Sequence, residues 1–220
     1  MDLEAFTSLF SGSPYKLLQQ HRACALDALL AVNRQVLCLS AETPASHPSP
    51  SWIKERPRQL KKLEQAVISR LNKPSLTSLP KTSILDVLQN QSHLALQIFR
   101  LSERLAVRPL KLPVEMIVPI NLLTSRFGKT ICQFRETIIK QDELNSGVFK
   151  KHQSHSLQTQ NKGLTQSVER LRMICQDLRD DVCQFQRDIE PVDVALLCLI
   201  LDDIIDLSFW MKSLLEHQKI

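Results

Sequence analysis

Two carboxylates near the C-terminal end of the sequence have the spacing of a chelating pair. Asp202 and Asp206 are four residues apart, so on a helix they lie on one face, one turn from each other. Carboxylate oxygens placed in this way can bind a hard cation. They can equally form the water-facing side of an amphipathic helix, whose apolar seam passes through Leu201 and Ile204. The second interpretation is favoured, which leaves Asp202 and Asp206 as weak metal candidates.

Other patterns that carry chemistry are weak or missing. His152 and His155 form a lone HxxH in the polar stretch 150–162, which has the composition of a mobile connection or a frayed helix start, so their role stays open. A di-iron bundle needs Glu-x-x-His motifs, and the sequence contains none. It also lacks GxxxxGK[ST], GxGxxG and GxSxG. We therefore expect no enzymatic activity and predict no cofactor.

The six cysteines also lack the spacing of a metal or redox site. None forms a CxxC pair, and most occupy apolar positions of helical patterns. In a reducing compartment such cysteines usually behave as small core hydrophobes, and this is the interpretation we favour.

Charge is unevenly distributed along the chain, whose net charge is +5. Residues 54–73 contain seven Lys or Arg against two Glu, and residues 177–206 contain nine acids against two Arg. Such runs are commonly solvated helix faces. They can also bind a partner on each side, or contact each other within the molecule. The partner-binding candidates in the basic segment are Lys54, Arg58, Lys61 and Lys62.

The basic segment also supports an alternative function, a helical protein associated with nucleic acid through residues 54–73. The sequence has no groove-reading motif, and its aromatic residues are few for stacking on single strands. Nucleic acid is therefore not the expected partner.

Composition points to an all-α fold of 220 residues, enough for a sizeable core. The chain has four glycines, one tyrosine and two tryptophans, whereas sheet proteins use glycine in turns and aromatics in strands. The expected helices cover about 15–39, 57–71, 83–105, 113–145, 164–189 and 191–215.

Particular residues set these boundaries. Ser83 with Asp86 resembles a capping box at a helix start, and Pro113 suits a first helical turn. Asn145-Ser146-Gly147 is typical of a helix stop. The last two segments have apolar residues every three or four positions, which predicts an antiparallel hairpin packed like a coiled coil. Pro191 starts the final helix, with Asp193 in its first turn.

Location follows from what the sequence does not contain. The opening Met-Asp-Leu-Glu-Ala-Phe has no basic region or long apolar run, so no secretory signal is expected. The most apolar stretch, residues 194–201, is too short for a membrane span, which needs about 20 residues. We expect a cytoplasmic protein; peripheral membrane association and a homodimer stay open.

Four segments together resemble the divergent PhoU-like family. Residues 9–21 (LFSGSPYKLLQQH) are similar to the start of these proteins, in which Phe-x-x-Ser-Pro leads into Leu-x-x-His. Residues 190–194 (EPVDV) resemble the Asn-Pro-Val-Asp-Val start of the family's last helix. Val118-Pro119 and residues 144–147 (LNSG) fall where the family has Val-Pro and a helix-ending glycine. The order and separation of these segments cover nearly the whole chain.

This resemblance implies an all-α PhoU-like fold: a single domain, 1–220, with helical units at about 14–106 and 112–218 in an elongated bundle. It also implies an accessory regulator of phosphate transport that accompanies a Pit-type transporter in bacteria. The family's acidic metal motifs are replaced here at residues 57–61 (PRQLK), 168–172 (VERLR) and 90–96 (NQSHLAL). Because Lys and Arg repel cations, the family's metal site is not carried over. The basic replacements can instead serve an anion such as phosphate.

Overall fold

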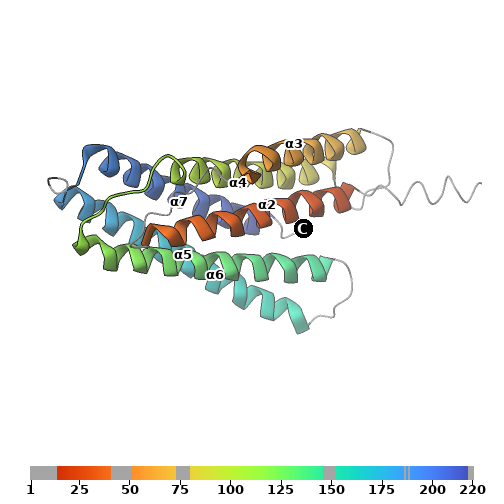
Figure 1. Cartoon of the computed structure of the whole chain (residues 1–220). Coiled ribbons are helices and arrows are strands. Elements are labelled where there is room, and N and C mark those ends of the chain that lie inside the picture. Colours follow the sequence, from red (N-terminus) through yellow and green to blue (C-terminus); the bar gives the residue numbers. More distant parts are fainter. Residues whose placement is uncertain are drawn as a thin grey trace, which may run out of the picture.

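The computed structural model describes residues 14–40, 51–72, 80–145, 152–185, 187 and 189–217. Within them the chain forms six α-helices, which confirms the all-α prediction. They are α2 (Pro14–Leu37), α3 (Trp52–Leu71), α4 (Lys81–Leu105), α5 (Ile117–Asn145), α6 (His152–Gln184) and α7 (Pro191–His217). Two short 3₁₀ turns, η1 (Cys38–Ser40) and η2 (Val114–Met116), follow α2 and precede α5. Figure 1 shows that the helices run along one long axis.

Each of the six helices contacts at least two others, and together they enclose one continuous core. α2, α3 and α4 contact one another, while α6 lies between α5 and α7. Contacts of α4 with α7 and of α2 with α5 join these two sets. α3 packs on α2 and α4 and lies at the outside of the bundle (Figure 1). The buried apolar residues of all six helices form a single cluster.

The α5 helix shows how the pattern of the sequence produces this core. Its fully buried residues follow three-or-four spacing: Met116 in the preceding turn, then Ile120, Leu123, Phe127, Ile131, Phe134 and Ile138. Burying a large apolar side chain stabilises the fold by about 1.5–3 kcal/mol, so this stripe binds α5 to its neighbours. Thr130 and Thr137 are also buried, and their hydroxyls donate to the carbonyls four residues earlier at 2.9 and 2.8 Å. These two hydroxyls are thus satisfied within the helix.

The α7 helix has two apolar seams instead of one. The predicted seam is buried except at its first residue, Val194, which is partly buried. Its other members are Leu197, Leu201, Ile204, Ser208, Met211 and Leu215. A second set of buried residues runs beside it: Leu196, Ile200, Leu207 and Leu214, with Asp193 and Asp203 in the same phase. Ion pairs from Asp193 and Asp203 to arginines of the α4 side of the molecule place this second seam against α4. α7 therefore packs between α6 and α4.

Two predicted helix starts were wrong. α3 begins at Trp52, so Pro57 lies inside the helix and not at its start. A proline there removes one backbone hydrogen bond, which a helix packed on two neighbours tolerates. α4 begins at Lys81, and the residue that caps it is Pro80, with no side-chain hydrogen bond. The predicted capping box of Ser83 and Asp86 does not form, because both residues already lie inside the helix.

Three further boundaries differ in detail. Pro113 precedes the η2 turn, and α5 starts at Ile117. α6 begins at His152, so the described part of the polar stretch 150–162 is helical and the helix-start alternative holds. α6 ends at Gln184, and Ile189 is buried in the connection to α7. The described part of α5 runs to Asn145, and Ser146 and Gly147, the rest of the predicted stop, lie outside the described residues.

Among the described helices, none combines the length and the apolar character that a membrane crossing requires.

Candidate functional site

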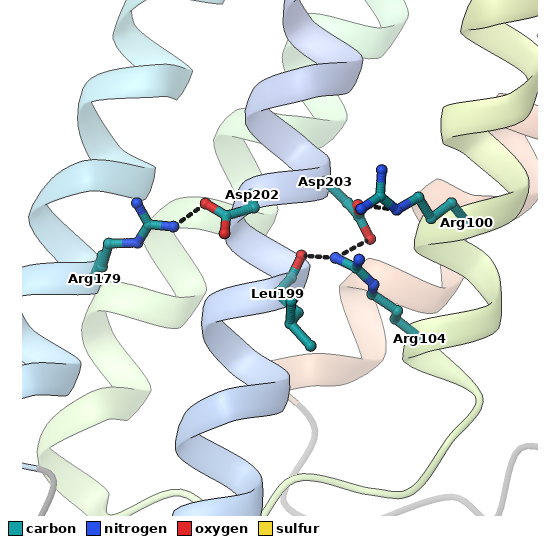
Figure 2. Close-up of polar contacts among 6 residues, drawn as sticks. All are labelled: Arg100, Arg104, Arg179, Leu199, Asp202 and Asp203. Atoms are coloured by element: carbon teal, nitrogen blue, oxygen red, sulfur yellow. Dashed lines mark hydrogen bonds and ion pairs between the residues drawn. The ribbon is translucent and has the colours of Figure 1, made fainter.

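The centre of α7 carries a buried carboxylate held by two arginines of α4 (Figure 2). Asp203 is fully buried, and its Oδ1 lies 3.2 Å from Arg100 Nε while its Oδ2 lies 2.8 Å from Arg104 Nη1. Arg104 also donates to the backbone carbonyl of Leu199 at 2.5 Å. A buried charge has to be paired to be tolerated, and here the pairing joins α4 to α7.

Burial dominates the electrostatics of this carboxylate. Loss of water raises the pKa of Asp203 from 3.8 to about 6, while Arg104 and Arg100 oppose the rise and the negative charge of Asp206 adds to it. The two guanidinium groups thus compensate only part of the desolvation cost. The carboxyl group of Asp203 therefore keeps its proton to a higher pH than a carboxyl group in water does.

The predicted metal candidates lie on another side of α7 and differ from each other. Asp202 is paired with Arg179 of α6 (Figure 2), whereas Asp206, one turn later, is exposed. A guanidinium beside Asp202 disfavours a cation at that carboxylate. Within the described residues, no group of three or more His, Cys, Asp or Glu side chains could hold a metal ion. The arrangement gives Asp202 an interhelix contact and leaves Asp206 in water.

A second buried carboxylate fixes the start of α7. Asp193 is fully buried, and its Oδ2 accepts hydrogen bonds from Arg108 Nη2 at 2.9 Å and from the backbone N–H of Lys111 at 3.2 Å. Arg108 also contacts Glu190 at 2.6 Å, and this hydrogen bond lowers the pKa of Glu190. Asp193 does lie in the first turn of α7, as predicted, and it ties the segment after α4 to that turn.

Sequence reasoning missed the arginines that neutralise these acids. Arg100, Arg104 and Arg108 are spaced four apart, which would place them on one face of α4 and its continuation. Asp193 and Asp203 occupy the second seam of α7, which a search for a single apolar stripe overlooks. The acidic segment therefore pairs with arginines of α4, of the segment after it and of α6. Among the described side chains no ion pair joins it to α3, so the predicted contact between the two charged segments is not seen there.

The predicted partner-binding residues lie on α3, where their side chains face water. Arg58, Lys61 and Lys62, which we call the α3 basic surface, are exposed and have no ion pair within the described part of the chain. Leu60, Val67 and Leu71, on the opposite side of α3, are buried. Lys54 belongs to the same helix, but its side chain lies outside the described residues. The structure therefore brings together three of the four predicted cations.

Two of the three positions at which the family has acidic motifs make contacts between helices. On α6, Glu169 pairs with Arg172 at 3.2 Å and with Lys212 of α7 at 3.7 Å. On α4, Gln91 Oε1 lies 3.0 Å from Nδ1 of the buried His21. Burial lowers the pKa of His21, against the opposing effect of the Gln91 hydrogen bond, and so favours the neutral imidazole. At these positions the structure uses polar residues to join helices.

The third position at which the family has an acidic motif, residues 57–61, lies on α3, and the two histidines of the HxxH pattern lie on α6. In residues 57–61, Leu60 is buried, while Arg58 and Lys61 belong to the α3 basic surface. His152 and His155 lie in the first turn of α6, and their side chains are outside the described residues.

Comparison with known proteins gives a result only at the level of structure. No protein-family model matches the chain, and no curated protein matches it. It is similar to the crystal structure of a PhoU-like protein from Shewanella oneidensis MR-1, with a TM-score of 0.70 and 19% identity over 93% of this chain and 96% of that one. It is also similar to a putative PhoU-like phosphate regulatory protein from the same organism, with a TM-score of 0.63 and the same identity and coverage. The chain has the PhoU-like fold that the sequence resemblance predicted.

Proposed function

We propose that this protein is a non-enzymatic regulator of inorganic phosphate transport that acts by direct contact with a Pit-type transporter. The observation that carries the proposal is the shared fold along 93% of the chain with a protein described as a putative phosphate regulatory protein. The order of the sequence segments that resemble the PhoU-like family also supports it, because these segments span nearly the whole chain.

The α3 basic surface is the proposed docking surface. Its three cations have no ion pair within the described residues, so they can form pairs with an acidic surface of the transporter without breaking internal contacts. Opposite charge across an interface mainly steers encounter and fixes orientation. α3 lies at the outside of the bundle, where a partner can reach it (Figure 1).

The same cations leave the alternative of a nucleic-acid-associated protein to be tested. The described side chains of α3 and its flanks, residues 55–72, include no aromatic residue that could stack on bases. We therefore favour a protein partner. Binding to DNA or RNA with a steep dependence on salt would support the alternative instead.

A pull-down from native membranes tests the docking role. We expect the unmodified chain to capture a phosphate transporter, and Lys61→Glu/Lys62→Glu to lower that capture about tenfold, since two attractive contacts become repulsive and 1.4 kcal/mol corresponds to a factor of ten. The matched control is Lys129→Glu/Arg135→Glu, which makes the same charge change at exposed positions of α5.

Two results would contradict the proposal. If the unmodified chain captures no transporter, the regulatory role loses its support. If both double variants weaken capture equally, overall charge and not the α3 basic surface governs the contact.

A further inference from the structure

Two ion pairs fix how α6 and α7 lie against each other. Glu169 Oε1 lies 3.7 Å from Lys212 Nζ, and Arg179 pairs with Asp202. A step of ten residues forward along α6, from 169 to 179, thus matches a step of ten residues back along α7, from 212 to 202. The helices are antiparallel and keep one register over this length.

The same register brings two cysteines together. One helical turn beyond the Arg179–Asp202 pair, a step of four residues forward on α6 reaches Cys183 and a step of four back on α7 reaches Cys198. Cys183 is exposed and Cys198 is partly buried, and neither forms a disulfide in the structure. Burial raises the pKa of the Cys198 thiol; Arg179 opposes this, and the charge of Cys183 adds to it. The register of the two ion pairs thus places the two cysteines opposite each other at the α6–α7 contact.

The other described thiols do not share this setting. Cys175, in the core seam of α6, is fully buried, and burial raises its pKa to about 12. Cys24 is buried in α2, Cys38 is partly buried in η1, and Cys132 is exposed on α5. The expectation that the cysteines are core hydrophobes holds for Cys24 and Cys175, and it is wrong for the exposed Cys132 and Cys183. Of these two exposed cysteines, only Cys183 lies opposite a second cysteine in the antiparallel register of α6 and α7.

We propose that Cys183 and Cys198 form a dithiol site that a hydroperoxide oxidises to a disulfide, which links α6 covalently to α7. Neither the fold resemblance nor the docking role of α3 assigns such a site, and the proposal does not depend on them. Cys183 lies in the last turn of α6, which ends at Gln184, so the chain can adjust there to the short distance that a disulfide requires.

The reaction balances with hydrogen peroxide as the oxidant. The Cys183 thiolate attacks one peroxide oxygen, the O–O bond breaks, and the departing hydroxide takes up the thiol proton as water, which leaves a sulfenic acid on Cys183. The Cys198 sulfur then attacks the sulfenic sulfur, the S–O bond breaks, and the hydroxide leaves with the Cys198 proton as a second water. Two thiols lose two electrons, and the peroxide gains them.

Peptide mapping under non-reducing conditions tests the proposal. The full chain is reduced, treated with hydrogen peroxide, alkylated and digested with trypsin. We expect residues 180–187 and 188–212 to appear as one disulfide-linked species that a dithiol reductant separates, with free thiols falling from six to four. The urea midpoint should shift upward on oxidation and return on reduction, because the link restricts the unfolded chain.

Variants separate the dithiol site from general thiol oxidation. Cys132→Ser removes an exposed thiol on another helix and should leave the linked species unchanged. Cys198→Ser should abolish it and leave a sulfenic acid on Cys183 that dimedone traps, and Cys183→Ser should abolish it without that adduct. Sulfinic acid on Cys183 without linked peptides, or links mainly between separate chains, would overturn the proposal.

Discussion

Helices α3 and α7 both carry a strong local charge, yet the fold treats the two charges in opposite ways. The cations of the α3 basic surface face water, whereas the carboxylates of Asp193 and Asp203 on α7 are fully buried. α3 has one buried side and one wet side, while α7 packs against neighbours on two sides. The sign and density of charge in a sequence therefore do not tell whether the charge is available; its phase relative to the apolar seams does.

The largest effect on stability is expected from removing a cation from the α4–α7 contact, which tests whether the buried charges of α7 matter more for stability than the exposed charges of α3. Losing one partner of a buried pair commonly costs about 3–5 kcal/mol. In Arg104→Met, Asp203 can take up a proton, which limits the loss of unfolding free energy to about 2 kcal/mol. Urea unfolding measures it, and Lys61→Met on α3 is the control that should change little. Equal effects of the two substitutions would remove the distinction between the helices.

The second prediction concerns pH and isolates Asp203. Its folded pKa, about 6, is above the ordinary value of 3.8, so the folded chain binds this proton more tightly than the unfolded chain does. The stability that this proton provides is present at low pH and is lost as pH rises through about 6. From pH 7 to pH 5 the free energy of unfolding should therefore rise about 1 kcal/mol more in the unmodified chain than in Asp203→Asn.

Urea unfolding of both chains at the two pH values gives this difference directly. Asp142, whose pKa burial also raises, titrates in both chains and cancels in the comparison. An identical pH dependence with and without the carboxylate would show that Asp203 is ionised as easily as a carboxylate in water.

The smallest expected effect belongs to α3. Lys61→Glu/Lys62→Glu should change the free energy of unfolding by less than about 0.5 kcal/mol, because exposed charges without partners contribute little to stability. Urea unfolding at low and moderate salt measures this change in the free energy of unfolding. A loss comparable to that of Arg104→Met would mean that these cations support the fold, and a docking role would then be hard to separate from folding.

The sequence predicts most of the fold because the apolar spacing is regular where helices pack on one side. The stripe of α5 and the first seam of α7 are where three-or-four spacing places them. The start of α3 was missed because Pro57 is typical of a first turn, whereas the helix begins five residues earlier, at Trp52, and contains this proline. The start of α4 was missed because a side-chain cap was expected where the structure uses none.

The candidate site was less predictable, because its contacts connect residues far apart in the chain. Asp203 differs from Asp202 and Asp206 in its phase, because it lies on the second apolar seam of α7. The position of Arg104 and Arg100 across the interface, which pairs the buried carboxylate, is not visible in the local sequence. The exposure of Arg58, Lys61 and Lys62 was easier to anticipate, because the apolar phase of α3 points in the other direction.

The double seam of α7 also bears on how the molecule opens. A helix held on two sides cannot separate from one neighbour without straining its contacts with the other, so its backbone amides are shielded until much of the bundle loosens at once. α3 rests on the bundle by one side, so we expect its opening to disturb fewer of the contacts that hold the other helices. Hydrogen exchange along the chain should accordingly be slowest in the final helix and fastest in the one that presents the cations.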